Sequence, residues 1–262
     1  IFAEQSINRN YNCLWLTLLD DDSPHFELYK RGISAFAEFT WGGLQRSKKA
    51  FKEAYRHRKF GPRFRAEEYA FIDGLDKPVA LWTNLLVEEA THRNALNQLE
   101  NPIEEHIIDL PEFDKKGSWS QKYAKRLAEV EEEATALKTI QKKLKLFQTL
   151  ETKEPYNLEI YNEVINLVNF NFKVMRSLKA FDSMLSSAEE NELINDLKNL
   201  AVEFKSIRAQ FENVYGKTRI LNKPDNYILD QDHHRHPANQ SISFDWQFTA
   251  ELMLLEKIEK HF

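Results

Sequence analysis

Three consecutive stretches of the chain place apolar residues at alternating intervals of three and four, the spacing that lines one face of an α-helix. The first covers residues 119–153, the second begins at Pro155 and the third ends at Gly216. Their apolar positions are Tyr123, Leu127, Val130, Ala134, Leu137, Leu144 and Phe147; Tyr161, Val164, Val168, Met175, Leu178 and Phe181; and Leu193, Leu197, Leu200, Phe204, Ile207 and Phe211. Short connections make consecutive helices antiparallel neighbours. The sequence therefore predicts a mainly α protein built on a bundle of three long antiparallel helices.

The scarcity of glycine and proline supports this fold class. The chain has 7 Gly and 8 Pro among 262 residues, too few for the many tight turns of a sandwich or barrel. A helical stretch is predicted from Arg65, with interruptions near Gly74 and Pro78 and a strongly apolar turn that includes Trp82. A last helix is predicted over residues 245–261. Loops are predicted over residues 101–119 and 217–241.

The first 61 residues have a different pattern. Residues 12–19, NCLWLTLL, form a short apolar run that predicts one buried strand of the parallel type. A helix is predicted after Ser23-Pro24, and a basic helix from Ser47 to Lys59. The first helix should end at Gly42-Gly43 and place one apolar face inward, formed by Phe26, Tyr29, Ile33, Phe36, Ala37 and Trp41. We take Gly61-Pro62 as the boundary between a segment of residues 1–61 and a helical domain of residues 62–262.

Composition excludes several classes of function. The formal charge of −5 and pI near 6.0 argue against a nucleic-acid-binding surface, because phosphate binding needs an excess of Lys and Arg. No apolar run approaches the roughly 20 residues that cross a bilayer, so a soluble chain without membrane contact is expected. One cysteine, Cys13, excludes an internal disulfide. Because it lies in an apolar run, we expect a buried, unreactive thiol.

Two polar clusters are candidates for chemistry, and each has a simpler explanation. Residues 230–236 combine Asp and His side chains that can ligate a divalent metal. Their spacing on a loop does not make them converge, so a solvated loop is favoured and no metal site is expected. Asp20, Asp21 and Asp22 follow the predicted strand. Consecutive loop carboxylates seldom face each other across a sugar, so we interpret them as charges near a helix N-terminus. Trp15 fits a core position better than the wall of a sugar pocket.

The first quarter of the chain resembles the end of the catalytic barrel in family 20 glycoside hydrolases, the β-N-acetylhexosaminidases. The matching pieces are CLWLTLL (residues 13–19), an acidic loop, ISAFAEFTWGG (residues 33–43) and RSKKAFKEAYRHRKFG (residues 46–61), in the same order and spacing. The resemblance implies that residues 12–19 are the eighth strand of a (β/α)8 barrel and residues 27–41 its eighth helix.

The same resemblance implies roles for two residues. Trp15 would match the aromatic wall around the N-acetylglucosamine ring. Thr17 stands where the family commonly has a glutamate that binds sugar hydroxyls, a departure that puts the sugar specificity in doubt. The family's catalytic Asp-Glu pair lies on an earlier strand, so this chain is expected to hold no catalytic residue and no cofactor. Hydrolysis by this chain alone is not expected.

These observations lead to two hypotheses. In the first, the chain is the C-terminal region of a larger hexosaminidase, and its helical domain stabilises the preceding catalytic barrel or helps to form a homodimer. Its partners would be that barrel and the carbohydrate substrate of the parent enzyme. In the second, the chain is a helical interaction or scaffold module without enzymatic activity. Because a lone strand would leave its edges bare, we expect residues 1–19 to be irregular or packed against the helical domain.

Overall fold

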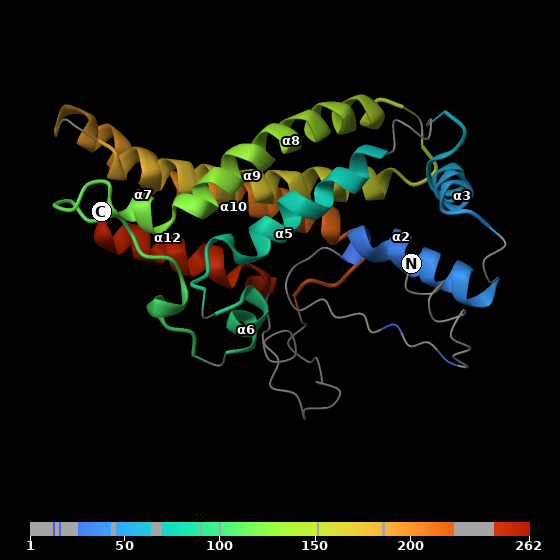
Figure 1. The fold of residues 1–262 in the computed structure, drawn as a ribbon, viewed down its shortest axis with the longest axis horizontal. Helices are drawn as coiled ribbons and strands as arrows, with labels where there is room; N and C mark the ends of the chain where they lie inside the picture. The colour runs from blue at the N-terminus through green and yellow to red at the C-terminus, as the bar shows by residue number, and fades with distance from the viewer. Residues whose placement is uncertain are drawn as a thin grey trace.

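The protein is mainly α, as predicted (Figure 1). The computed structural model describes Cys13, Leu16 and residues 26–42, 46–63, 70–89, 91–99, 101–150, 152–184, 187–222 and 244–262. Within these residues the only β pairing is an isolated antiparallel bridge between Val87 and Ile107. None of the described helices is long and apolar enough to cross a membrane.

The helices differ widely in length. In chain order they are α2 (Phe26–Trp41), α3 (Lys48–Phe60), α5 (Asp76–Leu85), α6 (Arg93–Gln98), α7 (Ser118–Lys122), α8 (Ala124–Gln148), α9 (Pro155–Asp182), α10 (Ser187–Tyr215) and α12 (Thr249–His261). Short 3-10 turns occur at Ala70–Leu75, Glu104–His106 and Phe244–Phe248. The three longest helices are those that the apolar spacing predicts.

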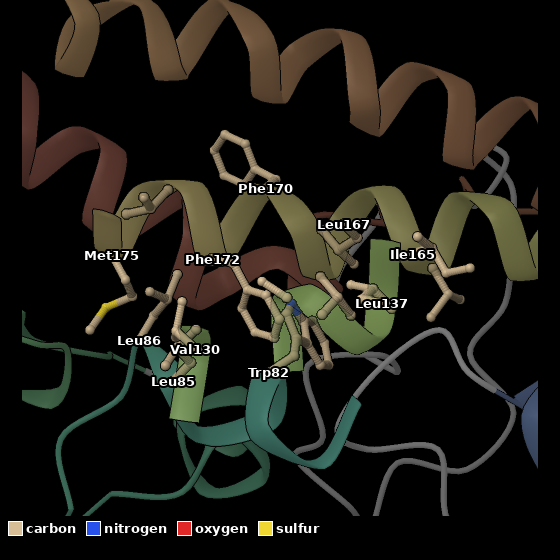
Figure 2. Close-up of a cluster of buried hydrophobic side chains, with 14 of the residues drawn as sticks. Trp82, Leu85, Leu86, Val130, Leu137, Ile165, Leu167, Phe170, Phe172 and Met175 are labelled. Carbon is tan, nitrogen blue, oxygen red and sulfur yellow. The ribbon is translucent and has the colours of Figure 1, made fainter. Parts of the chain in front are cut away.

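α9 is the central helix of the bundle (Figure 1). It packs against α8 and α10, while α5 packs against α8 and α9, and α12 against α10. Phe170 lies on the α10 side of α9, with its ring centroid 5.2 Å from that of Phe204. Phe172 lies on the other side, toward Trp82 of α5 and Val130 of α8 (Figure 2). A helix that is apolar on all sides belongs in the core, so the predicted three-helix bundle is wider and includes α5 and α12.

The prediction of one helix over residues 119–153 is wrong in two respects. The helix is interrupted at Tyr123, whose φ of −100° and ψ of 18° separate α7 from α8. The Tyr123 hydroxyl accepts a hydrogen bond from the Asp109 backbone N–H at 2.9 Å and donates one to Glu88. These contacts hold Tyr123 in place at the break. α8 then ends at Gln148, and Pro155 begins α9 because proline is well suited to the first helical position.

The interruption predicted near Pro78 is also absent. Pro78 is the third residue of α5. The backbone N–H groups of the first helical turn have no acceptor within the helix, so a proline there removes no hydrogen bond. The strongly apolar turn is confirmed, because the Trp82, Leu85 and Leu86 side chains are all buried.

Residues 101–117, predicted as a loop, carry part of the core. Ile107 and Ile108 are fully buried, and the Ile108 carbonyl accepts a hydrogen bond from Lys257 of α12 at 3.3 Å. Near the chain end, a ring nitrogen of His261 lies 3.2 Å from the Pro111 carbonyl oxygen. The predicted last helix begins later than expected, since a 3-10 turn precedes α12.

A fully buried ion pair joins α6 to α12. Arg93 donates two hydrogen bonds of 2.8 Å to the Glu251 carboxylate, and both side chains are 0% exposed. Asn171 of α9 donates to the same carboxylate at 2.9 Å. The Arg93 guanidinium stacks 4.0 Å from the Trp82 ring centroid and donates to the Thr83 carbonyl at 3.2 Å. Four helices therefore meet at one pair of charges.

Replacing Glu251 by Gln is expected to lower the free energy of unfolding by about 3–5 kcal/mol, because the Arg93 charge stays buried without its counter-charge. Urea unfolding followed by circular dichroism measures this loss. The control is Glu131→Gln, which breaks an exposed pair with Arg176 of 2.7 Å and should change stability by less than about 1 kcal/mol. Equal losses for the two variants would contradict the structural role of the buried pair.

Candidate functional site: the outward face of α2

α2 is attached to the bundle through a buried carboxylate. Glu27 is 1% exposed. It accepts a hydrogen bond of 3.1 Å from the Tyr156 hydroxyl at the start of α9. It also lies 2.7 Å from Arg219, whose guanidinium stacks 3.9 Å from the Tyr215 ring centroid. α2 is therefore fixed against the start of α9 and the end of α10.

A second ionic contact joins α2, α3 and the turn before α5. Arg31 of α2 and Lys52 of α3 both bind Asp73, the Lys52 contact being 2.7 Å long. Burial alone would raise the pKa of Asp73. The hydrogen bond from Lys52 and the charge of Arg31 together outweigh burial and lower this pKa below its usual value. The rings of Phe39 and Phe51, with centroids 5.6 Å apart, pack α2 on α3.

α3 begins and ends within one residue of the predicted bounds, Ser47 and Lys59. Ser47 caps its start by accepting a hydrogen bond of 3.1 Å from the Ala50 N–H. At the other end Gly61 takes a φ of 89°, a conformation that glycine adopts without strain, and its N–H donates to the His57 carbonyl at 3.0 Å. Lys59 contacts Glu154 at 2.9 Å, which places the end of α3 beside the connection from α8 to α9.

The apolar face predicted for α2 exists but does not pack on the bundle. We call it the outward face and define it by five side chains: Tyr29, Ile33, Phe36, Ala37 and Trp41. Trp41 is 96% exposed and Tyr29 is 45% exposed, while Ile33 and Phe36 are half-buried.

The residues of α2 that pack against the core are instead Leu28, Ala35 and Phe39. At 3.6 residues per turn they lie opposite Ile33, Ala37 and Trp41, and Tyr29 and Phe36 are at the border between the two sides. The inward position predicted for this face is therefore wrong, and α2 is apolar on two sides.

A hollow of about 870 Å³ adjoins the outward face where α2 meets α3. Phe36 and Trp41 line it from α2, and Phe51 and Arg58 line it from α3. Its lining combines these three aromatic rings with small and polar residues and with two opposite charges, Glu38 and Arg58. Such a surface is suited to contact with another macromolecule more than to acid–base chemistry.

A second hollow, of about 700 Å³, lies between α5 and α8. Two of its titratable groups, Tyr123 and Arg126, serve the structure. Burial, followed by the hydrogen bond to Glu88, raises the pKa of Tyr123 to about 12. Arg126 donates to the Leu85 and Val87 carbonyls at 3.0 and 2.7 Å. A tyrosine that keeps its proton and an arginine bound to backbone do not act as a general base or nucleophile near pH 7.

The residues predicted from sequence to contact sugar, Trp15 and Thr17, lie outside the described residues. The same holds for the predicted strand over residues 12–19 as a whole, for Asp20–Asp22 and for residues 230–236. Among the described residues no group of His, Cys, Asp and Glu side chains is arranged to hold a metal ion. The buried thiol predicted at Cys13 is wrong, since Cys13 is exposed. That prediction assumed a covered strand, and neither Cys13 nor Leu16 is in a strand.

The anchors of α2 were not identified from the sequence. Glu27 lies beside Leu28 on a helix whose apolar residues cover two sides. A carboxylate in that position is buried when the helix docks, and a buried carboxylate needs a positive partner. The partner, Arg219, is distant in the chain and follows the end of α10.

Replacing Asp73 by Asn should weaken the attachment of α2 to α3. At pH 7 the expected loss is about 0.5–1 kcal/mol, a small value because Asp73 is 36% exposed and solvent screens the pairs. The lowered pKa means that the carboxylate stabilises the fold fully above the ordinary Asp pKa of about 3.9. This contribution disappears as the pH falls through the lowered pKa of the folded state. Thermal unfolding of both proteins between pH 2 and 7 should therefore give curves that converge in acid, whereas a constant difference would contradict the prediction.

Known proteins give no direct guide to this surface. Comparison of the chain with models of protein families, with curated proteins and with solved structures finds no match.

Proposed function

We propose that this chain is the C-terminal, non-catalytic portion of a glycoside hydrolase that acts on terminal N-acetylhexosamine residues. Its helical domain stabilises the preceding catalytic barrel or mediates assembly. Two features support the proposal: the resemblance of residues 13–61 to the end of a family 20 barrel, and the outward face of α2.

The outward face is the observation that carries the proposal. An outer helix of a (β/α)8 barrel packs one face on the strands. In this chain α2 already uses its Leu28, Ala35 and Phe39 side against the bundle. The opposite side offers Ile33, Ala37 and the almost fully exposed Trp41. A helix that is apolar on two sides is suited to lie between two bodies, here the helical domain and the barrel.

In this proposal Trp15 would wall the sugar ring from the end of the eighth strand. Thr17, with a short hydroxyl side chain in place of the usual glutamate, would reach fewer sugar hydroxyls. Acid and base groups would come from the preceding part of the parent protein. The chain itself would contribute positioning and stability.

A second candidate function is a helical protein-interaction module. The outward face favours it too, because an exposed tryptophan beside aromatic side chains is typical of the centre of a protein interface. In that case the occupant of the face is a different protein, or a second copy of this chain.

Release of nitrophenol from a nitrophenyl N-acetylglucosaminide tests the proposed function. The 262-residue chain is expected to be inactive, and a longer chain that includes the preceding coding region is expected to be active. Activity of the short chain would overturn the non-catalytic assignment. Absence of activity in both would favour the interaction module.

A charge on the outward face tests the packing in the same two chains. Trp41→Glu should leave the stability of the short chain nearly unchanged, because the indole is already in solvent. In the longer chain it should lower stability by about 2–3 kcal/mol, since the carboxylate would be buried against the barrel. The control is Val202→Glu on α10, where Val202 is 67% exposed. Equal effects of Trp41→Glu on both chains, measured by thermal unfolding, would speak against a barrel on this face.

A further inference from the structure

α3 is a strongly basic helix at one end of a chain with a net negative charge. It contains six Lys and Arg residues and one Glu, whereas the formal charge of the whole chain is −5. Two of its cations are neutralised, since Lys52 binds Asp73 and Lys59 binds Glu154. Lys48, Lys49 and Arg58 are exposed and have no carboxylate partner among the described residues.

The position of two of these lysines is unfavourable for the helix itself. Lys48 and Lys49 are the first residues of α3, and no acidic residue lies in that turn. The N-terminus of a helix carries partial positive charge, so cations there are destabilising. Helix stability therefore does not account for these two lysines.

α8 adds a second group of positive charges at the same end of the molecule. Its residues 138–148 include four lysines and no acidic residue. Figure 1 shows the C-terminal end of α8 on the side of the bundle where α3 lies. The Lys59–Glu154 contact fixes α3 beside the connection that follows α8. We call this region the basic end and define it by the exposed side chains Lys48, Lys49, Arg58, Lys138, Lys142, Lys143 and Lys145.

We propose that the basic end binds an acidic polysaccharide, a polymer of amino sugars with carboxylate or sulfate groups. This inference rests on the proposed function, because a hydrolase of N-acetylhexosamine meets polymers in which that sugar alternates with an acidic one. α3 is roughly 20 Å long at 1.5 Å per residue, which spans several sugar units. Ammonium and guanidinium groups bind carboxylate and sulfate oxygens through charge-assisted hydrogen bonds.

Charge density favours a polysaccharide over a duplex nucleic acid at the basic end. Duplex DNA carries one negative charge per about 1.7 Å of helix axis, so about 12 charges lie along the roughly 20 Å of α3. α3 offers three exposed cations without a carboxylate partner among the described residues, Lys48, Lys49 and Arg58. The charges of an acidic polysaccharide are spaced by its neutral amino sugars, which matches this smaller number of cations.

The experiment measures binding of the 262-residue chain to an immobilised polymer of alternating N-acetylglucosamine and glucuronic acid. A neutral N-acetylglucosamine polymer of equal length is the reference ligand. Lys49→Glu combined with Lys142→Glu should lower the affinity about tenfold or more and flatten its dependence on salt. The control, Lys198→Glu combined with Lys205→Glu, makes the same charge change at two exposed positions of α10 and should have little effect.

Glycan binding and hydrolysis are measured separately. Equal binding of the neutral polymer, equal losses in both double variants, or tighter binding of duplex DNA at the same salt concentration would overturn the inference. Because no hydrolysis is measured, failure of the proposed function is seen separately, as a longer chain that is inactive on the nitrophenyl substrate. Charge-dependent binding with an inactive longer chain would retain the basic end as a glycan-binding surface and discard the hydrolase.

Discussion

The Arg93–Glu251 pair is the interaction on which the arrangement of the helices depends. Its two charges come from residues of different helices that are 158 positions apart in the sequence, and Asn171 and Trp82 connect them to α9 and α5. Removing both charges from water is costly, and the bidentate geometry with its additional hydrogen bonds offsets that cost only in one arrangement. The apolar contacts around α9 supply most of the stability, but apolar surfaces tolerate sliding. The ion pair fixes the register of α12 and α6 against the bundle.

A long helix can be predicted from sequence when apolar residues along its whole length are buried. α9 and α10 are predicted from their apolar spacing, because buried apolar side chains recur along each of these helices. The break at Tyr123 could not be predicted in this way, since its cause is a hydroxyl that binds Asp109 and Glu88. Glu88 is distant in the sequence from Tyr123. Local spacing carries no information about such a partner.

The candidate site shows the same limit more clearly. The spacing of apolar residues groups Ile33, Ala37 and Trp41 on one side of α2. It does not reveal that α2 has two apolar sides, or which of them meets the bundle. Contacts with residues distant in the sequence make that choice: Glu27 is buried against Arg219 and Tyr156, and the Phe39 ring packs on Phe51. The spacing of residues within α2 carries no information about these partners.

The net charge of the chain also carries no information about how the charges are distributed over the surface. A charge of −5 argues against phosphate binding for the chain as a whole, yet α3 and the end of α8 gather cations in one region. Electrostatic attraction between exposed groups acts over about 8–10 Å at physiological salt, so the local density of charge matters more than the total. α2 and α3 are consecutive and packed on each other, and they present an apolar face and a basic one. If the outward face holds the catalytic barrel, the basic end is built in part on α3, the helix that packs directly on the helix that meets the barrel.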